Sequence, residues 1–258
     1  QSEIKEMKLQ MFTNLSHEIR TPLTLVMTPL KKMREAEKDT KQKELYNLMY
    51  RNCLRILRLV NQLLDMRKVD NGQMQLHFLE TDVVYFIKDI MKSFDNLAVS
   101  KDIHFSITPA HEVTNLWIDQ GNFDKIIFNI LSNAFKHTPD NGSISIHVSE
   151  SRKNNGILES SVKEYVEFVI ENTGSSIDER HLDKIFDRFF QTDVHDAKIG
   201  SGVGLHLTKM LAILHHGDIK AYNTDEGMAF SLLIPVGNDH LSKEEMTKPT
   251  NHKDLYTK

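Results

Sequence analysis

Two segments with helical spacing, residues 1–36 and 41–68, are separated only by the polar stretch Lys38-Asp39-Thr40-Lys41. So short a connection joins antiparallel neighbours, which predicts a helical hairpin. Two helices bury little apolar surface, so we expect two chains to form a four-helix bundle; packing of the hairpin on the second domain of its own chain is the alternative. The second segment has a heptad seam in which Asn52, the one polar position, would fix the register. The seam is Leu45, Met49, Asn52, Ile56, Leu59, Leu63 and Met66.

The turn Asp70-Asn71-Gly72 separates this helical part from a mixed part, so we place a domain boundary there. It is also a candidate hinge, because glycine tolerates large backbone changes, although a plain turn explains it equally well. Apolar alternation and β-branched residues then predict strands at 75–78, 103–107, 115–118, 143–148, 165–170, 219–222 and 229–234. Helical spacing predicts helices at 83–98, 122–136 and 203–214.

Strands mixed with amphipathic helices in this way predict an α+β sandwich with one helical layer. From Asn238 onward the chain is polar and charged, which predicts a linker. The expected organisation is therefore an all-α hairpin at 1–70, an α+β domain at 71–237 and a polar tail or linker at 238–258.

Composition narrows the functional classes. The formal net charge of −4, with both signs interspersed, gives no basic face for nucleic acid and no polybasic segment for direct membrane contact. The single cysteine excludes an internal disulfide. No apolar run approaches the roughly 18 residues that span a bilayer. The chain begins in the middle of a helical pattern, so we expect a piece of a longer protein.

The first helix contains a histidine beside a carboxylate. An apolar stripe through Met11, Leu15 and Ile19 turns His17 away from the buried face. A lone histidine on a helix is usually an ordinary surface residue, but Glu18 can orient the imidazole or take its proton, and a neutral imidazole is available near pH 7. Thr21 lies one turn further along the same face, where its hydroxyl can position a water or a phosphoryl oxygen.

Two further stretches suit a nucleotide. The helix over 122–136 carries Asn129 and Asn133 one turn apart, with Lys136 and His137 on the same side, and amide oxygens beside an ammonium suit a magnesium polyphosphate. Alone, such a face is usually only a solvated surface. The run Gly200-Ser201-Gly202-Val203-Gly204-Leu205 opens a helix, where backbone N–H groups approach phosphates. A lone glycine cluster is a weak signal.

Order along the chain strengthens both signals. After the asparagine helix come Asn172-Thr173-Gly174, then Phe186-Asp187-Arg188-Phe189-Phe190, then the glycine run, then Asp225-Glu226-Gly227. Together with the His17 segment, this set resembles the boxes of the sensor histidine kinase core over residues 5 to 236. The resemblance implies a dimerisation and phosphotransfer hairpin followed by an ATPase domain of the histidine kinase/gyrase type.

By that resemblance, ATP phosphorylates His17, with Glu18 and Thr21 as catalytic neighbours, and an aspartate of a response regulator receiver domain then takes the phosphoryl group. Thr21 matches the position used when the same family dephosphorylates the receiver. Asn133 would be the Mg²⁺ ligand. The implied partners are a second copy of the chain and the receiver. The implied location is the cytoplasmic part of a membrane-anchored sensor, which could be a hybrid sensor. The implied ATP-binding residues are Asn129, Asn133, Lys136, His137, Asn172, Gly174, Arg188, Gly200, Gly202, Gly204 and Leu205.

Two positions depart from the family pattern. Asn172 stands where an aspartate usually contacts the adenine amine, and Ser176 replaces a glycine. An amide gives a weaker, uncharged hydrogen bond, but it can accept from the adenine amine and donate to the neighbouring ring nitrogen, so we expect ATP binding to be retained. If the amide rotates, it would satisfy guanine instead, and base selectivity would be looser.

Two other functions remain open at this stage. The chain would be a non-catalytic module, docking or dephosphorylating a receiver, if Asn172 weakens ATP use enough. An ATPase of the gyrase or mismatch-repair kind shares the asparagine and glycine boxes, but it gives no reason for the His17 segment.

Overall fold

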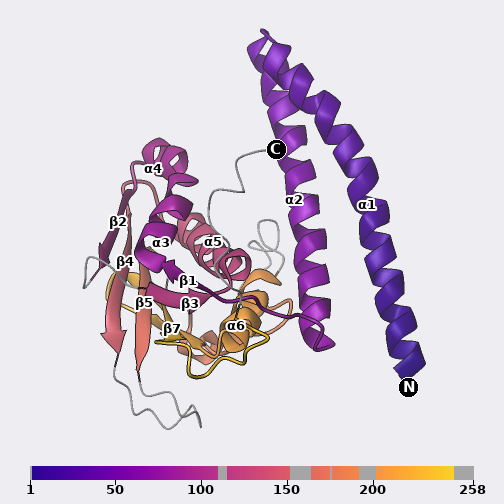
Figure 1. Ribbon diagram of the computed structural model, residues 1–258. Helices are drawn as coiled ribbons and strands as arrows, with labels where there is room; N and C mark the ends of the chain where they lie inside the picture. Colours follow the sequence, from indigo (N-terminus) through magenta and orange to yellow (C-terminus); the bar gives the residue numbers. More distant parts are fainter. Residues whose placement is uncertain (1, 110–114, 152–163, 175, 192–201, 247–258) are drawn as a thin grey trace, which may run out of the picture. The chain divides into compact units, whose positions relative to one another are not determined.

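The computed structural model describes residues 2–109, 115–151, 164–174, 176–191 and 202–246; for residues 2–18 it describes the backbone alone. The chain divides into two compact units, Gln1–Met74 and Gln75–Lys258. The family resemblance predicts this combination, a helical hairpin followed by a mixed α/β domain, and the structure has it (Figure 1).

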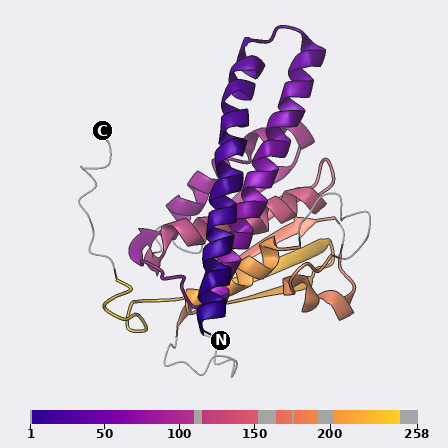
Figure 2. The same cartoon turned by 90° about the vertical axis from the view of Figure 1, so that its right-hand side faces the viewer.

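The first unit is an antiparallel helical hairpin. Helix α1 spans Ser2–Ala36 and α2 spans Thr40–Asp70, and the two run side by side in both views (Figures 1 and 2). Asp39 caps α2, because its side chain accepts a hydrogen bond from the Gln42 N–H at 3.0 Å. Arg20 on α1 donates from Nη2 to Asn61 Oδ1 on α2 at 2.8 Å. Helix α1 continues across both of its prolines.

The hairpin leaves much of its apolar surface uncovered. Leu30 and Met66 are its only buried apolar residues among those whose side chains are described. The Asn52 amide donates to Leu48 O of its own helix at 2.9 Å, so in this structure it makes a local bond. Apolar side chains that remain between 38% and 69% exposed include Leu25, Val26, Met33, Leu45, Leu48, Met49, Leu54, Ile56 and Leu63.

The second unit is built on a five-stranded sheet in the order β2-β4-β5-β7-β6. Strands β2 and β4 are parallel, and the other neighbours are antiparallel. A two-stranded antiparallel sheet pairs β1 with β3. The strands are β1 Leu79–Asp82, β2 His104–Pro109, β3 Asn115–Ile118, β4 Ser143–Ser151, β5 Tyr165–Thr173, β6 Asp218–Asn223 and β7 Gly227–Pro235.

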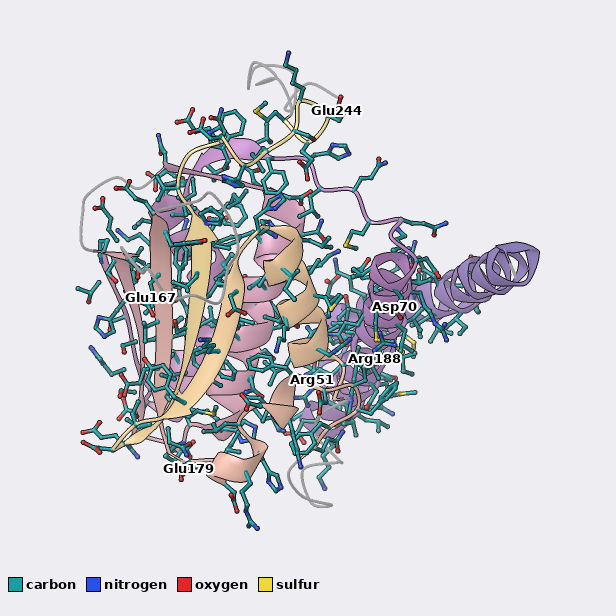
Figure 3. All side chains as sticks on the ribbon, turned by 90° about the horizontal axis from the view of Figure 1, so that it is seen from below. Arg51, Asp70, Glu167, Glu179, Arg188 and Glu244 are labelled. Carbon is teal, nitrogen blue, oxygen red and sulfur yellow. The ribbon has the colours of Figure 1, made fainter. Side chains whose placement is uncertain are left out.

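Helices cover one face of this sheet (Figure 3). They are α3 Val83–Lys92, α4 Asp95–Lys101, α5 Gln120–His137 and α6 Gly204–Leu214. Along β5, Val166 and Phe168 are buried while Glu167 between them points to the opposite face, as period-two alternation requires. Glu167 Oε1 there accepts a 2.5 Å hydrogen bond from the Ser231 hydroxyl. Two short 3₁₀ turns, Glu179–His181 and Lys184–Phe186, follow β5.

Two predicted elements are wrong in detail. The strand expected at 75–78 is displaced, because regular pairing begins only at Leu79 in β1. The single helix expected over 83–98 is two helices, and the break has a packing reason: Phe94 between them turns inward and stacks on the Phe135 ring with centroids 5.1 Å apart.

The linker expected from Asn238 does not begin there. Leu241 is buried, and the Glu245 side chain reaches back to the Ser242 N–H at 2.9 Å, an arrangement like a capping box. The Phe78 N–H donates to Glu245 O at 2.8 Å, and Phe78 pairs with Met246 in an isolated parallel bridge. We call residues 238–246 the strap; they fold against the second unit.

Candidate active site

Helix α5 presents the predicted asparagine face. Asp119 caps its first turn, accepting from the Asn122 N–H at 2.9 Å, and a row of apolar side chains from Phe123 to Phe135 is buried under the sheet. Burial of that row leaves Asn129 and Asn133 on another side of the helix, where each is half-buried. Lys136 and His137 are also half-buried, at the C-terminal end of α5.

Asn129 links the two predicted nucleotide boxes. Its Nδ2 lies 3.3 Å from Gly204 O and 3.4 Å from Thr208 Oγ1, and the Thr208 hydroxyl itself donates to Gly204 O at 2.9 Å. These bonds fix the start of α6 against α5, although the residues are 75 positions apart. Leu205, the next residue of α6, is half-buried.

Asn133 is the residue that the family resemblance predicts as a metal ligand. Its amide makes no hydrogen bond to any residue that the structure describes, so its oxygen is available to a ligand. The described residues contain no group of three or more His, Cys, Asp or Glu side chains suited to a metal. One amide oxygen fits Mg²⁺, which keeps several waters and takes its other ligands from phosphates.

The C-terminal end of α5 is joined to the end of β5. Gly174 has φ +126°, and a Cβ there would lie 2.6 Å from His137 O, so only glycine allows this approach. The contact brings Asn172, two residues earlier, to the same end of α5. Lys101 holds this end too, donating from Nζ to Phe135 O and Thr138 O at 3.1 Å each. Sequence reasoning missed Lys101, since nothing in its local pattern marks it.

Asn172 is 2% exposed, and its Nδ2 donates to Thr173 O at 3.1 Å. With the amide nitrogen turned to the backbone, Oδ1 is left as an acceptor. Asn223 of β6 fixes the segment that follows, because its side chain both accepts from the Ile177 N–H and donates to Ile177 O. Sequence reasoning missed this residue as well. Ser176 is exposed, and the structure gives no reason for its replacing glycine.

Arg188 is tied to the glycine-box helix. Its Nε donates to His206 Nε2 at 3.0 Å, and His206 Nδ1 lies 2.9 Å from Phe186 O. A ring that accepts at Nε2 and donates at Nδ1 is a neutral imidazole. At Gly202, φ is +66° and a Cβ would lie 2.6 Å from Phe189 Cα, so glycine is required where the chain passes Phe189.

The remaining predicted residues are less completely described. His17 and Glu18 lie on α1, but their side chains are outside the described set. Thr21 is exposed on the same helix, and Gly200 lies outside the described residues. No helix of the described residues is long and apolar enough to cross a membrane.

Sequence profiles match both units. The profile "His Kinase A (phospho-acceptor) domain" matches residues 7–72, and "Histidine kinase-, DNA gyrase B-, and HSP90-like ATPase" matches residues 118–238. Over 95% of the chain, the sequence is 33% identical to "Histidine kinase P4" of Formosa agariphila and 31% identical to "Sensor histidine kinase TmoS" of Ectopseudomonas mendocina. The chain belongs to the sensor histidine kinases. The phosphoacceptor match accounts for the His17 segment, for which the gyrase-like alternative gives no reason.

This histidine kinase sequence spans only part of its relatives: 18% of the Formosa protein, 25% of TmoS and 16% of "Hybrid signal transduction histidine kinase D" of Dictyostelium discoideum, to which it is 32% identical. Solved structures share the fold. Full-length ShkA in complex with AMPPNP has a TM-score of 0.68 at 21% identity, covering 87% of this chain and 45% of that one. Histidine kinase ThkA in complex with response regulator protein TrrA has a TM-score of 0.57 at 22% identity, covering 90% of this chain and 64% of that one.

Proposed function

We propose that this chain is an ATP-dependent kinase that phosphorylates its own His17 and passes the phosphoryl group to an aspartate of a response regulator receiver domain. One observation carries the proposal: Asn129 hydrogen-bonds the first residue of the glycine-box helix, which supports a single nucleotide site built from the two boxes. The phosphoacceptor profile over 7–72, in the same chain, supports a histidine as the nucleophile.

In this site the triphosphate would lie between α5 and the N-terminus of α6. The N–H groups at the start of α6, together with the glycine run Gly200–Gly202–Gly204, suit an anion. Asn133 would hold Mg²⁺, which would supply positive charge to neutralise the phosphates. Lys136, His137 and Arg188 would face the phosphates. Asn129 would keep the start of α6 in place against α5. The boundaries 1–70 and 71–237 remain our assignment of phosphoacceptor and ATP-binding domains.

The adenine end would lie at Asn172 and Gly174. The Asn172 amide nitrogen donates to Thr173 O, which favours presenting Oδ1 to the exocyclic amine of adenine. Guanine offers an oxygen at that position, so the amide would have to rotate and lose its bond to Thr173. We therefore expect adenine selectivity to be kept, in place of the looser selectivity that the sequence left open.

The transfer itself needs a neutral imidazole. An unprotonated ring nitrogen of His17 attacks the γ-phosphorus; a nitrogen–phosphorus bond forms, the bond to the β,γ-bridging oxygen breaks, and ADP leaves. The phosphorylated ring is cationic and gives its remaining N–H proton to Glu18. Catalysis is then mainly positioning and charge neutralisation, as in other phosphoryl transfers.

The proposed partners follow from the same reasoning. The exposed apolar seam of the hairpin supports a homodimer through a four-helix bundle. ThkA, of the same fold, was solved with a response regulator, which supports a receiver as the second partner, and Thr21 would serve in dephosphorylating it. We place the chain in the cytoplasmic part of a membrane-anchored sensor.

The receiver-docking or phosphatase module without kinase activity is the second candidate, because Asn172 lacks the charge expected at the adenine contact. Labelling with γ-³²P ATP and Mg²⁺ distinguishes the two. We expect the native chain to be labelled, His17→Gln to remain unlabelled, and His147→Gln, a change at an exposed histidine of β4, to be labelled like the native chain. ATP binding without any label in the native chain would favour the second candidate.

A further inference from the structure

The residues that lead from the hairpin into the second unit are fixed at two successive N–H groups. We call residues 75–78 the connecting segment. The His77 N–H donates to Asp119 Oδ2 at 2.9 Å, and the Phe78 N–H donates to Glu245 O of the strap at 2.8 Å. Successive N–H groups of an extended chain point to opposite sides, so the segment is held between the start of α5 and the strap. The Phe78 side chain is completely buried.

Asp119 has two carboxylate oxygens, and capping of α5 uses only one of them. Its Oδ1 caps α5 by accepting from the Asn122 N–H at 2.9 Å, and one oxygen suffices for a helix cap. Its Oδ2 is therefore available to hold the connecting segment through His77. Its backbone N–H donates to His215 Nε2, just after the end of α6, at 3.3 Å. A single residue thus joins the connecting segment to both nucleotide-site helices.

Two hydrogen bonds brace the helix pair. Asn129, in the middle of α5, bonds Gly204 at the start of α6, and Asp119, just before α5, bonds His215, just after α6. These two hydrogen bonds are 10 residues apart along α5 (119 to 129) and 11 residues apart along α6 (204 to 215), which is about 15 Å on each helix. Burial lowers the pKa of His215, so the ring stays neutral, with Nδ1 bonded to Leu211 O and Nε2 free to accept. Two braces this far apart fix the orientation of α6 against α5.

We propose that Asp119 is a positioning residue for phosphoryl transfer. Its second carboxylate oxygen fixes the connecting segment to the α5–α6 pair, so the path of the chain leaving the hairpin sets how the bound nucleotide is presented to His17. This inference rests on the proposed kinase function. Asn133 lies 14 residues further along α5, about 21 Å away, so Asp119 acts on orientation without contacting the nucleotide.

Asp119→Ser separates the two roles of the residue. Serine is a good helix cap but offers one oxygen, so it keeps the bond to Asn122 and loses the bond to His77. Asp82→Ser is the matched control, because Asp82 Oδ1 caps α3 through the Tyr85 N–H at 2.9 Å. His77 is exposed, so water replaces the lost acceptor and the melting temperature should change little.

The test measures labelling rate against ATP concentration, affinity for a fluorescent ATP analogue, and hydrogen exchange at the His77 amide, all in the full chain. For Asp119→Ser we expect about fivefold slower labelling at saturating ATP, the equivalent of about 1 kcal/mol, with affinity within twofold and faster exchange at His77. Asp82→Ser should match the native chain in all three.

Two results would overturn the inference and leave the proposed kinase function in place. Equal losses of affinity, melting temperature and rate would make Asp119 a helix cap only. An unchanged labelling rate, with faster exchange at His77, would show that the joint does not set the transfer geometry. Absence of label in the native chain would instead refute the proposed kinase function, and this positioning role with it.

Discussion

Replacing Asn172 with aspartate should change ATP affinity and stability in opposite directions. Asn172 is 2% exposed and its Nδ2 donates to Thr173 O. A carboxylate cannot donate, so the free chain loses a hydrogen bond worth about 1 kcal/mol. A carboxylate oxygen would then lie next to Thr173 O, and the two oxygens repel each other. For a unit of this size, that lowers the melting temperature by about 2–4 °C.

With ATP bound, the same carboxylate accepts a charge-assisted bond from the adenine amine. Such a bond is worth about 2 kcal/mol against about 1 kcal/mol for an amide, a difference of roughly fivefold in affinity. Asn172→Ala removes the acceptor and should bind ATP about fivefold more weakly than the native chain. The expected order of affinity is therefore aspartate, asparagine, alanine.

Isothermal titration with ATP and Mg²⁺, paired with thermal melting of the free proteins, tests both parts. GTP in place of ATP tests the amide orientation. We expect GTP to bind the native chain at least tenfold more weakly than ATP, because rotation of the Asn172 amide would break its hydrogen bond to Thr173 O and misalign its hydrogen bond to the base. Equal ATP affinity in all three proteins would refute the adenine contact. Weaker binding by Asn172→Asp than by the native chain would refute the charge argument.

Three further changes test other parts of the site. Gly202→Ala, with φ +66° and a neighbouring backbone at 2.6 Å, should lower labelling more than tenfold, whereas Gly237→Ala, with φ +76° in open space, should leave it nearly unchanged. Asn129→Ala removes the donor to Gly204 O and should weaken ATP binding about fivefold, measured by titration; unchanged affinity would contradict its bracing role. Burial lowers the folded pKa of His215 below the unfolded value of about 6.5, so its contribution to stability is full above pH 6.5 and is lost as the pH falls below it; urea unfolding of His215→Gln should show a smaller acid loss than the native chain.

The periodic features of the chain were predictable. Helix α2 begins at Thr40, one residue before the predicted start at 41, and β3 has the predicted bounds Asn115–Ile118. A repeat of 3.6 or 2 residues records which face is buried, and burial determines these elements. The break at Phe94 was not predictable in this way, because the apolar spacing continues through it and the rings that Phe94 packs on, Phe128 and Phe135, belong to a helix much later in the chain.

The sequence motifs of the site were predictable, but the hydrogen bonds that hold them in place were not. Motif order indicated that Asn129 and Gly204 belong together, and their hydrogen bond agrees with that. The supporting bonds from Lys101, Asp119 and Asn223 were missed, because each joins a side chain to a backbone group 34 to 46 positions away and leaves no local pattern. The strap did have a signal: Ser242 and Glu245 stand at capping-box spacing within the stretch predicted to be a linker.

The chemistry and position of the phosphoryl label decide whether His17 is the phosphoacceptor. The chain is incubated with γ-³²P ATP and Mg²⁺, treated with acid or alkali, digested, and the labelled peptide is sequenced. We expect a label that acid removes and alkali leaves, in the peptide that contains His17. A label stable to acid, or one that maps to another residue, would contradict it.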